Sequence, residues 1–96
     1  MRRGQIWLIR GARERLGLVI SSDVYNSTDT PVVIVAEVVP AALLREEIFP
    51  IRFGDYYIMP SRLSSPMRKW LHQVVDVADP ITMSRCGRAL RILEEI

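Results

Sequence analysis

The sequence predicts a small, mainly β fold (α+β): a strongly bent sheet or barrel accompanied by one helix at the C-terminus. Two observations support this prediction. Short β-prone segments, about five in number, are separated by clusters of turn-forming residues, and the segment after Pro80 has the periodicity of an amphipathic helix. Many short strands with one terminal helix are typical of a bent sheet that buries one face against that helix. The 96 residues suit a single domain over residues 1–96.

Three strands are predicted in the N-terminal half. Gln5–Arg10 is short and rich in β-forming residues, and Leu16–Ser22 forms the second strand after a polar loop at Gly11–Arg15. Residues 23–30 are rich in turn formers. Val32–Val39 is an almost unbroken run of β-branched residues, which predicts a strand buried on both of its faces.

The C-terminal half is predicted to contain a hairpin, a further strand and a helix. After a helical turn over residues 41–47, Ile48–Phe53 and Tyr56–Met59 flank a Gly-Asp pair that is typical of a hairpin. Trp70–Val77 is predicted to be a strand. Thr82 is expected to cap a helix that has two stripes of side chains. The apolar stripe contains Met83, Cys86, Leu90 and Leu93, and the basic stripe contains Arg85, Arg88 and Arg91.

The composition excludes several classes of protein. One cysteine rules out an internal disulfide and favours a reducing compartment, and one cysteine with one histidine cannot form a Cys/His zinc site. No apolar run approaches the ~20 residues that a membrane span needs. We therefore expect a cytoplasmic protein with no structural metal or other cofactor. The mean hydropathy of +0.13 is high for so small a chain and indicates an apolar surface hidden in an oligomer.

Positive charge is concentrated at the N-terminus. Residues 1–15 contain five arginines and one glutamate, whereas residues 16–60 contain two basic and six acidic residues. Of the thirteen basic residues, twelve are arginine, whose fixed fork of donors suits a phosphate group. A GC-rich genome would also favour arginine, so the clustering rather than the number indicates an anionic partner.

Four motifs, in this order along the chain, resemble those of the MazF/PemK/Kid toxins. Arg3–Trp7 is similar to the family's opening Arg-Gly-(Asp/Glu)-Ile-Trp, and Arg15–Asp23 resembles its Arg-Pro-x-Leu-Val-Val-Ser-x-Asp strand. Val33–Ala36 resembles the third strand, and His72–Val75 resembles the later Asp-Gln-(Val/Ile)-Arg segment. Leu16 departs from the pattern, since it replaces the family's proline.

The resemblance implies a fold, an activity and partners. Family members share a small SH3-like β-barrel of about five to seven strands with a C-terminal helix, and they act as homodimers. Most are metal-independent endoribonucleases that cut single-stranded mRNA, as toxins of type II toxin–antitoxin systems. A cognate antitoxin blocks their RNA groove. The related CcdB branch has the same fold but inhibits DNA gyrase, so gyrase inhibition, or binding without catalysis, remains an alternative for this chain.

Arg15 matches the family's catalytic arginine, which binds the scissile phosphate and stabilises the charge of the transition state. Arg13 takes this place if the loop register differs, and an Arg15 paired with Glu14 or another carboxylate is the structural alternative. The family's second catalytic group, a Thr or Ser, is replaced by Val39, which cannot transfer a proton. Either another group compensates, or the protein binds RNA without cutting it.

His72 is the expected substitute for the missing proton-transfer group. It stands where the family often has aspartate, before Gln73, and an imidazole is well suited to acid–base work at neutral pH. A packed structural histidine is the alternative. Glu37 is a further candidate base, although a strand carboxylate commonly pairs with an arginine instead. The expected RNA-binding residues are Arg13, Arg15, Glu37 and Gln73, and no metal ligand is expected.

Five aromatic side chains are candidates for stacking on unpaired bases. They are Trp7, Tyr25, Tyr56, Tyr57 and Trp70. For the two tryptophans, a place in the core or in a dimer interface is the favoured alternative. The arginines of the basic helix stripe are expected to be solvated, with an antitoxin contact as their alternative role.

Overall fold

Six strands form one antiparallel sheet in the part of the chain that the computed structural model describes, residues 1–44 and 49–95. The strands are β1 (Gln5–Arg10), β2 (Glu14–Val19), β3 (Val35–Pro40), β4 (Ile51–Phe53), β5 (Tyr56–Ser64) and β6 (Leu71–Val77). Their order in the sheet is β4-β5-β3-β2-β1-β6. The helical elements are α1 (Asp23–Asn26), the 3-10 helices η1 (Ala41–Leu43) and η2 (Arg68–Trp70), and α2 (Pro80–Glu94).

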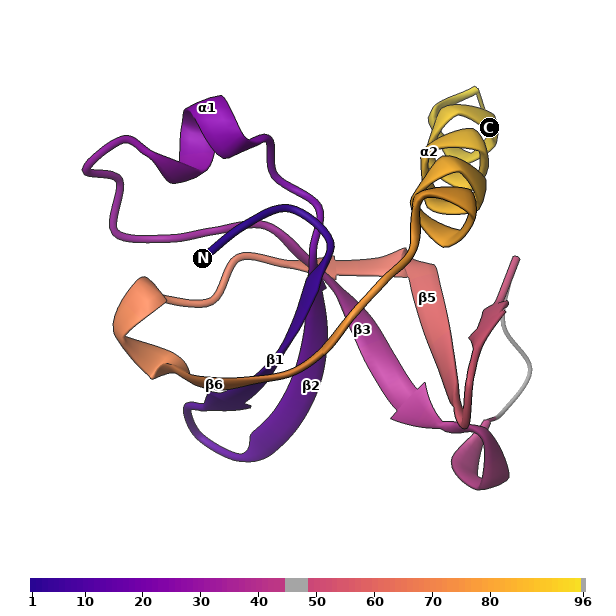
Figure 1. Cartoon of the computed structure of the whole chain (residues 1–96), viewed down its shortest axis with the longest axis horizontal. Helices are drawn as coiled ribbons and strands as arrows, with labels where there is room; N and C mark the ends of the chain where they lie inside the picture. The colour runs from indigo at the N-terminus through magenta and orange to yellow at the C-terminus, as the bar shows by residue number, and fades with distance from the viewer. Residues whose placement is uncertain (45–48, 96) are drawn as a thin grey trace.

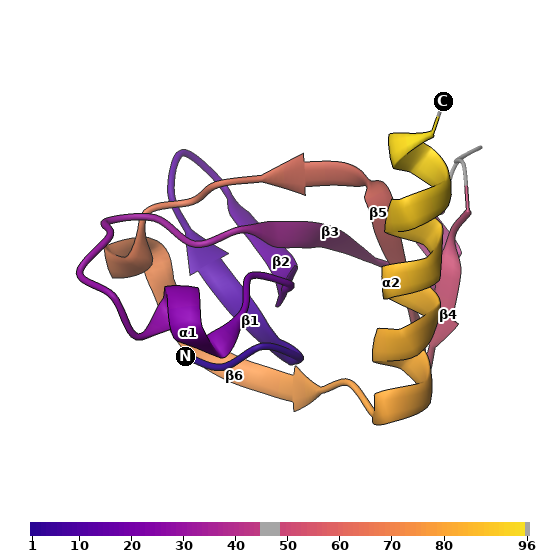
Figure 2. The same ribbon diagram turned by 90° about the horizontal axis from the view of Figure 1, so that it is seen from above.

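The sheet is strongly twisted and curls into a half-barrel, with α2 beside β4 and β5 and α1 at the opposite end (Figure 1, Figure 2). The predicted fold class, mainly β with one C-terminal helix, is confirmed. The predicted hairpin is also confirmed, because β4 and β5 pair directly across the Gly54-Asp55 turn. No helix in the described residues is long and apolar enough to span a membrane.

Two apolar clusters lie on opposite faces of the sheet. The cluster packed against α2 contains Ile6, Leu18, Ala36, Val38, Ile51, Ile58, Cys86 and Ala89. The other cluster contains Ile9, Val19, Val33 and Val35, with Trp7 and Trp70 packed against it. Successive residues of β3 point into both clusters, because side chains alternate along a strand. The prediction of a strand with two buried faces is therefore confirmed.

Several strand boundaries differ from the predicted ones, and three of these differences bear on the candidate site. β2 begins at Glu14, so Arg15 belongs to the strand and not to the loop before it. β3 begins only at Val35, since Val32 forms an isolated bridge. β5 continues to Ser64, because it pairs with β3 again after a bulge. All three differences follow from pairing between strands, which local residue preferences do not encode.

Two further predictions concern the connections on either side of β3. The turn-rich segment 23–30 contains α1, whose first turn is capped by the Ser22 hydroxyl, which accepts a hydrogen bond from N of Tyr25 at 3.1 Å. η1 lies within the predicted helical turn over residues 41–47. The last three residues of that turn, and Ile48 of the predicted hairpin, lie outside the described residues.

The start of α2 corrects the predicted cap. Asp79, not Thr82, precedes the first helical turn, and Pro80 takes the first helical position, where an N–H would have no helical partner. Thr82 is buried, and its hydroxyl donates a hydrogen bond to the Asp79 carboxylate. This hydrogen bond holds the pKa of Asp79 below its usual range. The basic stripe of the helix is exposed, as predicted.

Candidate functional site

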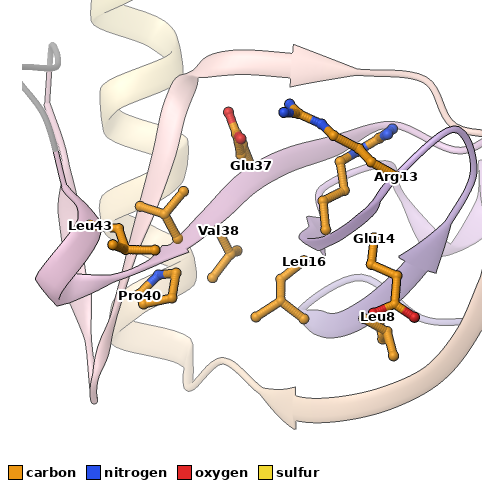
Figure 3. A pocket seen from close by; sticks show the side chains of 10 residues that line it. Leu8, Arg13, Glu14, Leu16, Glu37, Val38, Pro40 and Leu43 are labelled. Atoms are coloured by element: carbon orange, nitrogen blue, oxygen red, sulfur yellow. The ribbon is translucent and has the colours of Figure 1, made fainter.

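An open pocket of about 410 Å³ lies where β2, β3 and η1 meet. Figure 3 shows its lining divided between two sides, with Arg13 and Glu37 on one side and apolar side chains on the other. The mainly apolar side contains Leu8, Leu16, Val38 and Pro40, and the Glu14 side chain lies beside Leu8 there. An apolar wall with a few convergent charged groups is the composition typical of a ligand site.

The pairing of β2 with β3 places Arg15 and Glu37 on the same face of the sheet. Gly17 lies opposite Glu37, and Arg15 precedes Gly17 by two residues, which returns its side chain to the same face. Arg15 and Glu37 are therefore diagonal neighbours, with about 7–8 Å between their Cα atoms. Both side chains line the pocket.

Gly17 makes this arrangement possible, because no side chain fits at its position. A Cβ atom there would lie 2.7 Å from Cδ1 of Ile9 and 2.9 Å from Cγ2 of Val35. Both neighbours belong to the core cluster on the face of the sheet that also carries Arg15 and Glu37, called the charged face below. The glycine lets this core close directly beside the charged groups.

The guanidinium groups of Arg13 and Arg15 make no hydrogen bond or ion pair with any residue in the described ranges 1–44 and 49–95. Glu14, the acidic neighbour of Arg15 in the sequence, pairs instead with Arg10, with 3.0 Å between Oε1 and Nε. Arg15 is half-buried at the pocket wall, whereas Arg13 is exposed. The structural alternative, Arg15 held by Glu14, is not what the structure shows, so both cations can meet an anionic ligand.

Glu37 is half-buried in the pocket and has an arginine partner, as a strand carboxylate commonly does. Its Oε2 accepts a hydrogen bond from Nη1 of Arg62 at 3.3 Å. Sequence reasoning does not identify Arg62, which lies beyond the predicted end of its strand. Val39 contributes only methyl groups to the pocket wall, so the hydroxyl of the family pattern has no replacement at that position.

The short loop between β1 and β2 rests on the indole ring of Trp70. A Cβ atom on Gly11 would lie 2.9 Å from Cε3 of that ring. The ion pair between Arg10 and Glu14 closes the base of the same loop. These contacts fix the position of the β1–β2 loop, and the loop in turn places Arg13 at the pocket.

His72 and Gln73 lie on β6, at the edge of the sheet, and line neither of the pockets that contain Arg15. β1 separates them from β2, because Ile9 pairs with Arg15 on one side and with Leu71 on the other. Two strand spacings amount to about 10 Å. Both side chains are exposed, so His72 is not a packed core residue. The fold of one chain does not bring His72 into the arginine pocket.

The tryptophans belong to the core, as the favoured alternative predicts. Trp7 and Trp70 are half-buried and pack against the cluster on the charged face of the sheet. Tyr56 packs against the other cluster, and the Tyr57 ring lies under Arg52, with 5.3 Å from Cζ to the ring centroid. None of the five aromatic candidates lines the pocket of about 410 Å³.

The chemistry present in the pocket is that of the guanidinium groups of Arg13 and Arg15 and the carboxylates of Glu14 and Glu37. The described residues contain no group of three or more His, Cys, Asp or Glu side chains that could hold a metal ion. Burial raises the pKa of the Cys86 thiol to about 11, so this thiol stays protonated at neutral pH and is not a nucleophile. Among these side chains, Arg13 and Arg15 can bind an anionic ligand.

The comparison with known proteins identifies the class of fold. No protein-family model matches the sequence, and no curated protein sequence matches it. Solved structures match over nearly the whole chain, and those reported below are named an endoribonuclease bound to its cognate antitoxin, MazF, and the toxin MazF-mt6. The chain therefore has a MazF-type toxin fold.

Three of these structures define the likeness. An endoribonuclease in complex with its cognate antitoxin, from a mycobacterial species, is 18% identical and superposes with a TM-score of 0.86 over 100% of this chain and 96% of its own. MazF from Deinococcus radiodurans is 14% identical, with a TM-score of 0.83 over 100% of this chain and 97% of its own. The Mycobacterium tuberculosis toxin MazF-mt6 is 10% identical, with a TM-score of 0.78 over 96% of this chain and 97% of its own.

Proposed function

We propose that the chain is the toxin of a type II toxin–antitoxin system, a metal-independent endoribonuclease that cleaves single-stranded mRNA. The observation that carries the proposal is the pocket between β2 and β3, which Arg13 and Arg15 line without a partner in the described part of the chain. It lies in a fold whose solved examples include two named endoribonucleases, one of them in complex with its cognate antitoxin.

Cleavage of RNA without a metal ion needs three groups. A base takes the proton of the ribose 2′-hydroxyl, whose oxygen forms a bond to phosphorus. The bond from phosphorus to the 5′-oxygen breaks, and an acid protonates that leaving oxygen. A cation stabilises the charge that develops on the phosphoryl oxygens, and Arg15 suits this role because it is half-buried, where electrostatic contacts are stronger than in water.

Glu37 and His72 are the proposed proton-transfer groups. Glu37 has the position of a base, since it lines the same pocket as Arg15. His72 would act as the acid only on RNA that extends from the pocket across β1 to β6, because the fold of one chain keeps its side chain out of the arginine pocket. Cleavage rates of Glu37→Gln and His72→Gln across a pH range test the two roles. A wild-type profile for either variant contradicts the role of that residue.

The proposed activity is tested by incubating the purified protein with a long RNA in EDTA and mapping the fragment ends. We expect cleavage in single-stranded regions, and a rate lower by about 100-fold for Arg15→Gln. Arg91→Gln is the matched control, because Arg91 is an exposed arginine of α2 that lines neither pocket. Wild-type cleavage by Arg15→Gln, or cleavage that EDTA abolishes, contradicts the proposal.

Two protein partners are proposed, a cognate antitoxin and a second copy of the chain. Structurally similar proteins have been solved as MazE-MazF complexes, which supports the antitoxin. Exposed apolar side chains along the sheet edge and the start of α2 support a homodimer. They are Val74, Val75, Val77 and Ile81. Light scattering should give twice the chain mass of 11.0 kDa, and a monomer at micromolar concentration would contradict the dimer.

Gyrase inhibition is the alternative that Val39 favours, because a binding protein needs no proton-transfer group. Two of the similar solved structures, both from mycobacterial species, are named endoribonucleases, which favours RNA cleavage instead. We therefore expect gyrase to supercoil DNA normally in the presence of the protein. The proposed place of action is the cytoplasm, where mRNA and a reduced Cys86 would both be found.

A further inference from the structure

A second pocket of about 280 Å³ adjoins the first and shares Arg13, Arg15 and Glu37 with it. Its remaining lining comes from β5 and includes Arg62 and Ser64. The two pockets together form a groove walled by the β1–β2 loop, β2, β3 and β5. This groove is longer than one phosphate group requires.

Arg62 reaches the groove because β5 contains a bulge. Ala36 and Glu37 are consecutive on β3, but their partners on β5 lie four residues apart. Residues 60–62 are therefore looped out of the ladder, and Pro60, which has no N–H to donate, is tolerated there. Bulges re-aim side chains and are common beside active sites. Here the bulge places Nη1 of Arg62 at 3.3 Å from Oε2 of Glu37.

The charges of the groove do not balance. Among the described residues, Arg13, Arg15 and Arg62 line the groove beside two carboxylates, Glu37 and Glu14, which leaves one positive charge in excess. Glu14 is already paired with Arg10. Arg62 donates through Nη1 to Glu37, and its side chain is 50% exposed, against 23% for Glu37. A guanidinium has five N–H donors in a planar fork, which lets an arginine contact a carboxylate and a phosphate from different edges.

We propose that Arg62 is a second phosphate-binding residue, which holds a neighbouring nucleotide of the strand whose scissile phosphate lies on Arg15. This inference rests on the proposed ribonuclease function. Glu37 pairs with Arg62 but does not contact the phosphate of that nucleotide, since both groups are negatively charged. The groove then selects a polynucleotide backbone over a mononucleotide, because cations in series track the backbone of a single strand.

The test measures binding without cleavage. A 2′-O-methyl RNA oligonucleotide lacks the attacking hydroxyl, so its affinity can be followed by fluorescence anisotropy over a range of salt concentrations. Each phosphate contact contributes about 0.7 to the slope of log affinity against log salt for a single strand. We expect Arg62→Gln to reduce that slope by about 0.7 and to weaken binding by about tenfold at low salt. Arg91→Gln should change neither quantity.

Glu37→Gln separates a direct contact from a positioning role. It removes the ion pair but keeps all three guanidinium groups, so its affinity should equal or exceed that of the wild type. If Arg62→Gln and Glu37→Gln weaken binding equally, Arg62 acts only through Glu37 and the proposal fails. Arg62→Lys keeps the charge and should retain the wild-type salt slope, which also guards against a misfolded glutamine variant.

The failure of this inference can be told apart from the failure of the proposed function. If Arg15→Gln weakens binding and Arg62→Gln does not, the ribonuclease site stands and the second phosphate contact is refuted. If neither variant weakens binding, the groove is not the RNA site and both proposals fail. A dinucleoside monophosphate has one phosphate, so Arg62→Gln should leave its affinity unchanged.

Discussion

Two regions of the molecule use arginine in opposite ways. At the corner between α1 and η2, the Arg68 guanidinium donates to the backbone oxygens of Asn26 and Thr30, each at 2.6 Å. In the groove, Arg13 and Arg15 donate to no residue within the described ranges. Arg68 is therefore part of the fold, whereas Arg13 and Arg15 still have donors that an anion could accept from. The acceptors within reach, and not the residue type, decide which role an arginine has.

The buried polar groups at this corner form hydrogen bonds with one another, whereas the guanidinium groups of Arg13 and Arg15 have no such partners in the described residues. Oγ of Ser21 donates to Oδ1 of Asn26 at 2.6 Å, and Nδ2 of Asn26 donates to the backbone oxygen of Ser21 at 2.9 Å. Both residues are buried, and no buried side-chain N or O atom in the described residues lacks a partner. Satisfied polar groups of this kind stabilise a fold, whereas the donors of the groove can still form bonds to an anion.

The contrast is sharpened most by Arg15→Gln, which should affect activity and not stability. We expect kcat/KM for RNA cleavage to fall by about 100-fold, because a donor to the transition state is lost. The free energy of unfolding should stay within about 0.5 kcal/mol of the wild type, because no contact within the fold is removed. Urea denaturation beside single-turnover cleavage measures both quantities. A stability loss as large as that of Arg68→Gln would break the comparison.

Arg68→Gln should do the reverse. Its loss leaves the carbonyl groups of Asn26 and Thr30 without their donor, and we expect the free energy of unfolding to fall by about 2 kcal/mol. The folded fraction should cleave RNA at the wild-type rate. Urea denaturation monitored by tryptophan fluorescence gives the stability, and an unchanged midpoint would show that the corner does not depend on this guanidinium.

The substitution of glycine by alanine should change stability in opposite directions at Gly17 and at Gly87. Gly17→Ala forces a Cβ atom against Ile9 and Val35, so we expect a loss of about 1–3 kcal/mol in stability and a displaced groove. Gly87→Ala lies in α2 with nothing within 4 Å of the added carbon, and should gain about 0.5–1 kcal/mol from helix propensity. Thermal unfolding of both variants measures the difference, and a shift of the same sign in both would contradict this packing.

The smallest effect is expected from the cap of α2. Because the hydrogen bond from Thr82 lowers the pKa of Asp79 in the folded state, its stabilising contribution is present above the unfolded-state pKa. That contribution is lost as the pH falls through the lower folded-state value. The stability difference between wild type and Asp79→Asn should therefore shrink as the pH falls below about 4. A difference that grows on acidification would reverse this sign.

The fold could be predicted largely because its signals are local. The β-branched run at Val32–Val39 favours a strand that is buried on both faces. The Gly54-Asp55 pair favours a hairpin because its backbone can adopt the geometry of a tight turn. The helix cap could not be placed as well, because Asp79 and Thr82 are both good capping residues. Pro80 distinguishes them, since proline favours the first helical position.

The site could be predicted only where its residues are close along adjoining strands. Arg15 and Glu37 meet because β2 pairs with β3, neighbours in the sequence order of strands. His72 does not join them, because β6 pairs with β1 and leaves β1 between them. Arg62 depends on a bulge set by the β3–β5 register, for which Pro60 inside the strand is the one sequence signal.

The central claim, that Arg15 meets the phosphate of a bound strand while Arg68 stays within the fold, can be observed directly by NMR. The Nε–Hε signals of the arginines are followed during titration with a 2′-O-methyl RNA oligonucleotide. We predict that the Arg15 signal shifts in step with binding and that the Arg68 signal does not move. Binding of the oligonucleotide with an unmoved Arg15 signal would contradict the account.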